Sequence, residues 1–207
     1  MYYDMRPGQV LHLFAQLLDY PRGDLRGVAA QGAALAADRS PTAAATLREF
    51  ESFVSRTPLT RLEELYTSVF ELDATCHPYI GYHLFGESYK RSSFLLGLKD
   101  RYRPYNVDCG VELPDHLAVI LCYLAVHENW EECQEIITEG LHPALHQMLH
   151  NHEDDPPDPA IPKQTPPGEE YRQLLQALYE VLLTMAPDLA LPVASHPVNF
   201  LFAAPCH

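Results

Sequence analysis

The stretch EEYRQLLQALYEVLLTM, from Glu169 to Met185, decides the fold class of this chain. Its apolar residues recur every three or four positions, which is the spacing of one face of an α-helix. Strict alternation, which a half-buried strand requires, is absent from it. The segment therefore predicts an amphipathic helix, whose buried face consists of Tyr171, Leu174, Leu175, Leu178, Val181 and Leu182.

The same periodicity extends over most of the chain upstream. Ser40-Pro41 and Thr57-Pro58 each indicate an N-cap residue followed by proline in the first helical position. No internal repeat and no alternating strand pattern is visible. The sequence predicts an all-α fold, a single-domain helical bundle, with helices over 10–18, 25–38, 41–54, 58–70 and 92–102, a further one opened by Pro114-Asp115, and later ones separated by Asn129 and Gly140.

Length and proline content define the expected domain organisation. A chain of 207 residues fits one domain. Six of the 18 prolines fall between Pro156 and Pro167, a density that removes too many backbone donors for a helix or strand to persist. We expect a helical domain over 1–186, interrupted by a mobile acidic loop over 153–167, and an extended C-terminal tail over 187–207.

The charge of the chain limits the partners it can attract. Asp and Glu number 28 against 14 Lys and Arg, which leaves a formal net charge of −14. A negative field repels nucleic acid and anionic membranes and attracts cationic partners. We therefore expect a cationic partner and no nucleic acid.

Several features indicate a cytoplasmic protein. The longest apolar run, Leu117 to Val126, has ten residues, whereas a membrane-spanning helix needs about 20. The N-terminal residues show no basic segment followed by an apolar one, so no secretory signal is expected. Five cysteines without CxxC spacing are typical of reduced thiols.

Motifs for common enzyme chemistry are missing from the sequence. It contains no GxGxxG or GxxxxGK[ST] phosphate loop, no GxSxG nucleophile turn and no HExxH metal motif. We therefore expect a protein that is not an enzyme and that has no cofactor of its own.

One histidine cluster raises an alternative function. His142, His146 and His150, here called the histidine stripe, follow one another at steps of four on a predicted helix. Two of them can share a transition metal, but three span about 12 Å and cannot all bind one ion. Leu141, Leu145, Met148 and Leu149 define the buried face beside them, so partly exposed histidines without a metal are the simpler interpretation. A metal-binding protein remains the alternative hypothesis.

A second pattern concentrates negative charge. Glu128, Glu131, Glu132, Glu135 and Glu139, here called the acidic stripe, share one face of a predicted helix, and no Lys or Arg within the segment pairs with them. The stripe either binds a cationic ligand or is a solvated face.

The segment PYIGYHLFG, residues 78–86, is rich in aromatic residues at a place between helices where turn residues are expected. It either packs into the core as an irregular segment or lines a groove for the apolar face of a peptide.

Four strings in order resemble those of the NarJ/TorD/DmsD-type redox-enzyme maturation chaperones, with the closest similarity to the nitrate reductase assembly branch. The first, LEELYTSVFE at 62–71, is similar to the L-x-x-x-Y-x-x-x-F-[ED] helix of that branch. The others are YHLFGE at 82–87 followed by Lys90-Arg91, LGLKDRY at 96–102 and ELPDHL at 112–117. The resemblance covers roughly residues 60–126.

The resemblance implies an all-helical, cytoplasmic and non-catalytic chaperone. Such proteins bind the N-terminal leader, or remnant leader, of the catalytic subunit of a molybdopterin-containing oxidoreductase. They hold that subunit for insertion of the molybdenum cofactor, before membrane docking or export. The chaperone is expected to be a monomer or a dimer, and a flexible basic leader is expected to fold into a helix as it binds.

The resemblance places the peptide-binding site at Glu71, Tyr82, Phe85, Arg91, Asp115 and His116, to which the acidic stripe adds Glu128, Glu131, Glu132 and Glu135. Each residue also has a structural interpretation. Asp115 fits the first turn of a helix, Glu71 fits a helix end, and Arg91 fits a pair with an internal carboxylate. His116 can titrate near neutral pH.

Overall fold

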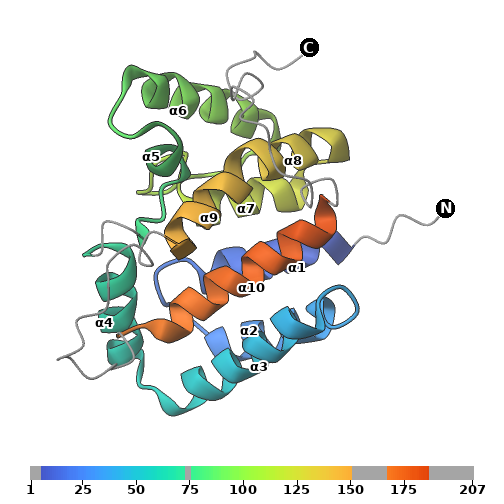
Figure 1. Ribbon diagram of the computed structural model, residues 1–207, viewed down its shortest axis with the longest axis vertical. Coiled ribbons are helices and arrows are strands. Elements are labelled where there is room, and N and C mark those ends of the chain that lie inside the picture. Colours follow the sequence, from blue (N-terminus) through green and yellow to red (C-terminus); the bar gives the residue numbers. More distant parts are fainter. Residues whose placement is uncertain (1–5, 73–75, 151–166, 187–207) are drawn as a thin grey trace.

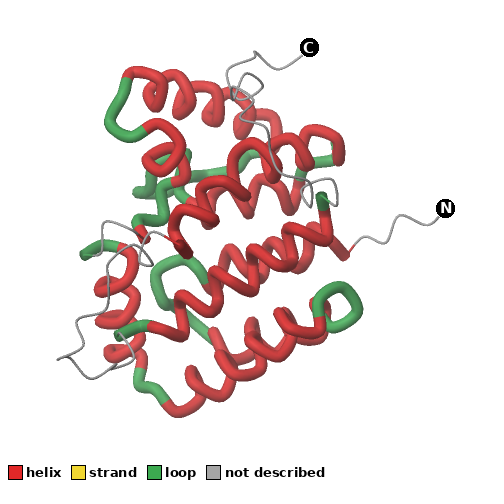
Figure 2. Tube along the Cα trace, in the orientation of Figure 1, coloured by secondary structure: helices red, strands yellow, loops and turns green. Residues whose placement is uncertain are grey.

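The described residues form an all-helical structure, as the sequence predicts. The computed structural model describes residues 6–72, 76–150 and 167–186. Within these ranges all regular secondary-structure elements are helices or helical turns (Figure 2). The β-structure there is limited to one antiparallel bridge between Tyr79 and His116.

The described α-helices have from six to seventeen residues, and two shorter turns of other helix types lie among them. In chain order they are α1 (Arg6–Leu17), α2 (Leu25–Ala36), α3 (Pro41–Arg56), α4 (Leu59–Phe70), α5 (Ile80–Phe85), α6 (Tyr89–Tyr102), the 3-10 turn η2 (Arg103–Tyr105), α7 (Leu117–Val126), α8 (Trp130–Ile136), the π-helical turn η3 (Ile137–Leu141), α9 (His142–His150) and α10 (Glu169–Met185).

The helix α10 crosses the middle of the molecule, and the other helices pack around it and α1 (Figure 1). On one side lie α2 and α3, which pack against each other; on the other lie α7, α8 and α9. The short α5 packs against α6 and α9 at the far end, and α4 stands at the side, in contact with α10.

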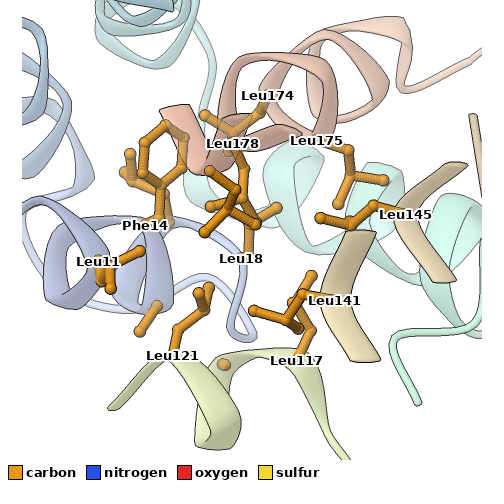
Figure 3. Close-up of a cluster of buried hydrophobic side chains, with 14 of the residues drawn as sticks. Leu11, Phe14, Leu18, Leu117, Leu121, Leu141, Leu145, Leu174, Leu175 and Leu178 are labelled. Atoms are coloured by element: carbon orange, nitrogen blue, oxygen red, sulfur yellow. The ribbon is translucent and has the colours of Figure 1, made fainter. Parts of the chain in front are cut away.

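One hydrophobic core joins these layers. Its centre is made of leucines and a phenylalanine that converge from four parts of the chain (Figure 3). The predicted face of α10 is entirely buried, because Tyr171, Leu174, Leu175, Leu178, Val181 and Leu182 all belong to this core. Burial of this face accounts for most of the stability of such a helix.

The backbones of α1 and α7 approach closely where a glycine stands. A Cβ atom placed on Gly8 would lie 2.5 Å from the carbonyl oxygen of Ala125. A side chain at this position would therefore push the two helices apart, and the close contact depends on glycine.

The capping prediction is confirmed at one proline and wrong at the other. Ser40 is the N-cap of α3, and its Oγ accepts a hydrogen bond from the amide of Ala43 at 3.1 Å, with Pro41 as the first helical residue. At the second site α4 begins at Leu59, so the N-cap is Pro58. Thr57 instead ends α3, where its Oγ1 donates to the carbonyl oxygen of Phe53 at 2.8 Å.

Other boundaries also differ from the predicted ones. The aromatic segment 78–86 is partly helical, since it contains α5, and α6 begins at Tyr89, three residues before the predicted start. The helix α7 begins at Leu117, after Pro114-Asp115. Gly140 does not separate two helices, because it lies inside the π-helical turn that connects α8 to α9 without a break.

Parts of the predicted domain organisation fall outside the described residues. They include nearly all of the loop 153–167 and the whole tail 187–207. Among the described helices, none combines the length and apolarity that a transmembrane passage requires.

The core tyrosines generate a stability prediction. The Tyr171 ring is surrounded edge-on by Phe50, Tyr66 and Phe70 at 5.5–5.8 Å, and within the described ranges its buried hydroxyl has no hydrogen-bond partner. Removing an unsatisfied buried hydroxyl relieves a desolvation cost. We expect Tyr171→Phe to raise the free energy of unfolding by about 1 kcal/mol in urea titrations.

The matched control is Tyr102, whose buried hydroxyl donates to the carbonyl oxygen of Pro114 at 2.7 Å. Tyr102→Phe leaves that carbonyl without its donor and should lower the free energy of unfolding by about 1–3 kcal/mol. Equal losses in both variants would contradict the assignment.

Candidate functional site

Two backbone hydrogen bonds bring the segments of the candidate site together. The amide of Ile80 donates to the carbonyl oxygen of Asp115 at 2.8 Å, and the amide of Leu117 donates to that of Pro78 at 2.7 Å. They form the bridge between Tyr79 and His116, whose rings meet edge-on at 5.4 Å. The start of α5 is thereby fixed to the start of α7.

A buried ion pair lies directly behind this bridge. The Nε of Arg91 is 2.9 Å from Oδ2 of Asp115, whose side chain is fully buried, while that of Arg91 is 19% exposed. The interpretation that Arg91 pairs with an internal carboxylate is confirmed. The guanidinium carbon of Arg91 also lies 5.7 Å and 6.0 Å from the ring centroids of Tyr79 and Tyr82, within the range of cation–π attraction.

Gly81 makes room for this pair. A Cβ atom on Gly81 would lie 2.6 Å from Oδ2 of Asp115 and 2.9 Å from the Phe94 ring. Any larger residue would therefore displace the carboxylate that Arg91 holds.

The N-cap of α7 is His116, so the interpretation of Asp115 as a first-turn acid is wrong. The Nδ1 of His116 accepts a hydrogen bond from the amide of Ala118 at 3.2 Å. Because Nδ1 acts as the acceptor, the proton of the neutral ring is on Nε2. Burial lowers the pKa of His116 below its ordinary value and so favours this neutral form.

In front of the bridge is a hollow of about 260 Å³, here called the tyrosine hollow. Two carboxylates, Glu71 and Glu112, stand at its wall among aromatic rings and imidazoles. Glu71 ends α4 as its C-cap, which confirms the structural interpretation of that residue. The lining residues are Tyr20, Tyr66, Phe70, Glu71, His77, Pro78, Tyr79, Glu112 and His116.

Hydrogen bonds hold the polar groups of the hollow in place. The hydroxyl of Tyr79 donates to Oε2 of Glu112 at 2.7 Å. Burial and this hydrogen bond raise the pKa of Tyr79, so the phenol keeps its proton. Nδ1 of His77 lies 3.0 Å from the carbonyl oxygen of Phe70 and, since a carbonyl can only accept, it donates there. The hollow therefore combines the hydrogen-bonded carboxylate of Glu112 and the exposed one of Glu71 with aromatic rings, an arrangement suited to a cationic side chain.

The structure brings together only part of the predicted peptide-binding set. Glu71 and His116 line the tyrosine hollow, whereas Arg91, Asp115 and Tyr82 form the layer behind it. Phe85 packs against Phe94 with ring centroids 5.4 Å apart.

Sequence reasoning did not select Tyr20, Tyr66, His77 or Glu112. Glu112 and Tyr66 stand inside the quoted strings 112–117 and 62–71, so the resemblance contained a signal for them. Tyr20 follows the first helix, and only the folded structure brings it to α4.

The acidic stripe lies elsewhere, at the corner between α7 and α8, and one of its members is paired. The premise that the stripe lacks basic partners is wrong for Glu132, which points inward. Its Oε1 is 3.3 Å from Nε of Arg101 and accepts from the hydroxyl of Tyr123 at 3.3 Å, and its Oε2 is 3.1 Å from Nε2 of His127. The partner missing from the stripe's own segment comes from α6.

The rest of the stripe does not follow one regular helix. Glu128 precedes the N-cap residue Asn129, and Glu139 lies in the π-helical turn. Glu131 and Glu135 are exposed on α8. Burial, followed by repulsion from neighbouring carboxylates, raises the pKa of Glu135.

The histidine stripe is engaged in contacts with other side chains and the backbone. Nε2 of His142 is 2.7 Å from the hydroxyl oxygen of Tyr179, and the rings of these two residues stack on each other. The rings of His146 and His150 stack at 4.2 Å, and Nδ1 of His150 donates to the carbonyl oxygen of His146. Over residues 6–72, 76–150 and 167–186, no three His, Cys, Asp or Glu side chains are grouped as metal ligands would be.

Comparison with known protein families gives a match over residues 36–154, to the family described as nitrate reductase delta subunit. The chain belongs to this family. The matched range runs from α3 to α9 and includes most of the tyrosine hollow, the bridge and the ion pair. The delta-subunit family comprises chaperones of the NarJ/TorD type, so the resemblance of the four strings is confirmed. A comparison with curated proteins finds no match to the chain.

The buried ion pair generates a prediction about the two partners. Arg91→Met removes the cation and leaves a fully buried carboxylate, which should lower the free energy of unfolding by about 3–5 kcal/mol. Asp115→Asn leaves Arg91, which is partly exposed and can be hydrated, and should cost at most about 2 kcal/mol. Urea titrations of both variants measure this difference, and a larger loss in Asp115→Asn would contradict it.

The buried histidines predict a loss of stability in acid. Burial lowers the pKa of His116, His83 and His142 from the ordinary value of 6.5. As the pH falls below 6.5 the unfolded chain therefore takes up protons that the folded chain does not, and the free energy of unfolding decreases. In urea titrations on either side of this pH, His116→Asn, which keeps a capping side chain, should show a smaller decrease than the parent.

Proposed function

We propose that this protein binds the N-terminal segment of the catalytic subunit of a nitrate reductase-type molybdoenzyme. Membership of the delta-subunit family makes it a chaperone for molybdoenzyme maturation. The proposal adds which part of the partner is bound and where. The observation that carries it is the tyrosine hollow, where Glu71 and Glu112 stand among aromatic rings.

Charge supports a basic side chain of the partner as the occupant of the hollow. Two carboxylates at its wall attract an arginine or lysine, and the rings of Tyr20 and Tyr79 line the same hollow. The guanidinium carbon of Arg22 lies 5.8 Å from the ring centroid of Tyr20, so there is room over this ring for an arginine side chain.

The bound segment is then held until the molybdenum cofactor has been inserted into the catalytic subunit. This step takes place in the cytoplasm, before membrane docking or export, and it requires no enzymatic activity and no cofactor of the chaperone. Residues 1–186 act as the binding domain in this proposal, with 187–207 as a tail. Monomers and dimers are both compatible with it.

The exposed part of the acidic stripe provides a second place where charge can act. Glu128, Glu131 and Glu135 lie on the surface at the corner of α7 and α8. There they contribute to the long-range attraction of a cationic segment, whereas Glu132 is engaged with Arg101.

The test is calorimetric titration with the N-terminal peptide of the molybdoenzyme catalytic subunit encoded nearest to this protein, at low and high salt. We expect micromolar or tighter binding that weakens with salt, because opposite charges attract across the hollow. Glu112→Gln should weaken it by about 5–30-fold, which corresponds to about 1–2 kcal/mol.

Glu49→Gln is the control for net charge, since Glu49 is exposed on α3 and does not line the hollow. Its affinity should stay within about twofold of the parent. Failure of the parent chain to bind the peptide, together with failure of the whole subunit to co-purify, would overturn the proposed function.

A further inference from the structure

A hollow of about 650 Å³ with an apolar floor lies between α1 and α2 and is bounded by the end of α7. Val126, the last residue of α7, stands at its edge and is 51% exposed. The lining residues are Gly8, Gln9, His12, Leu13, Gln31, Ala34, Leu35, Ala125 and Val126.

A third hollow of about 460 Å³ is a neighbour of both this apolar hollow and the tyrosine hollow. It shares the lining residue Gln31 with the apolar hollow and Tyr20 with the tyrosine hollow. Along α1 the lining positions 9, 12 and 16 follow one another at steps of three and four, so they lie on one helix face, and Asp19 lines the third hollow just after the end of α1. The three neighbouring hollows are together called the α1–α2 seam.

Acidic residues stand at both ends of the seam. Asp19 and Asp24 join Glu71 and Glu112 near Tyr20, and Glu128 follows Val126 by two residues at the other end. In the apolar hollow the polar lining side chains are the amides of Gln9 and Gln31 and the imidazole of His12, whereas the third hollow is lined by Arg22 as well as by Asp19 and Asp24. An occupant that fits this pattern has an apolar face with basic residues beside it.

Charge also distinguishes a second copy of this chain from a segment of another protein as the occupant of the seam. A second copy of this chain carries the same net charge of −14, so net repulsion disfavours it as the occupant of the seam. A cationic segment of another protein is attracted. The length is suitable as well, since the twelve residues of α1 measure about 18 Å, which a helix of about three turns spans.

We infer that the α1–α2 seam binds the N-terminal segment of the catalytic subunit as an amphipathic helix, with its apolar face against Leu13, Leu35 and Val126. A basic residue of the same segment enters the tyrosine hollow. This inference rests on the proposed function and extends it, because the seam's α1 wall lies outside the range that matches the family. Recognition then depends on apolar contacts as well as on charge.

The test uses a substitution that changes peptide affinity in opposite directions through charge and through apolar contact. Ala34 is exposed in the seam, and Ala34→Glu places a carboxylate on its apolar floor while adding one more negative charge to the chain. If charge alone governs binding, the cationic peptide should bind this variant at least as tightly as the parent. If its apolar face occupies the seam, affinity should fall by about tenfold or more.

The matched control is Gln147→Glu, which adds the same charge at an exposed position of α9 that does not line the seam. Titrations use the full chain and the N-terminal peptide described above, and they should give an affinity within about twofold of the parent for this control. A parent that binds while Ala34→Glu binds equally well overturns the seam alone. A parent that does not bind the peptide overturns the seam, and if the whole subunit also fails to co-purify it overturns the proposed function as well.

A second arm tests the same contact from the side of the peptide. Replacing the apolar residues of the peptide by serine should weaken its binding to the parent, and Ala34→Glu should then have little further effect, because the two changes remove one interaction. Sedimentation of the parent and of Ala34→Glu completes the comparison. A change of oligomeric state with unaltered peptide affinity would assign the seam to a second copy and overturn the inference.

Discussion

The hydrogen-bonded bridge between Tyr79 and His116 is the constraint on which the functional half of this structure depends. Two short backbone contacts fix the beginning of α5 to the beginning of α7, although the segments lie more than thirty residues apart. The bridge turns Tyr79 and His116 toward the hollow on one side. On the other side it brings Asp115 to Arg91, and Gly81 leaves the space that this ion pair occupies. The groups that line the hollow and the groups of the buried ion pair are therefore neighbours in sequence but face opposite ways.

The distribution of charge follows from this arrangement. Arg91 and Arg101 are turned toward the interior, where each is paired with a carboxylate, Asp115 or Glu132. Each pair withdraws one positive and one negative charge together, so the formal net charge of −14 remains on the rest of the chain. This excess of negative charge extends the range over which a cationic segment is attracted.

Much of the fold is predictable from the sequence because it depends on local periodicity. The range 169–185 is helical over its full predicted length, and Ser40 caps its helix as expected. The site is less predictable. Tyr20, Glu71 and Glu112 meet only through tertiary packing, and no local pattern encodes such a meeting. The capping role of His116 was equally hidden, since histidine is an uncommon N-cap and Asp115 beside it is a common one.

The π-helical turn at Ile137–Leu141 did leave a signal in the sequence. From Cys133 to Met148 the buried positions come in two series that advance by four, 133, 137, 141, 145 and 136, 140, 144, 148. In a regular α-helix each step of four turns by about 40°, so such a series would wind away from the core. The wider π turn absorbs part of this rotation. If one residue were removed there, α9 would turn by about 100° relative to α8. In the π-helical turn the number of residues is therefore constrained more tightly than the identity of each residue.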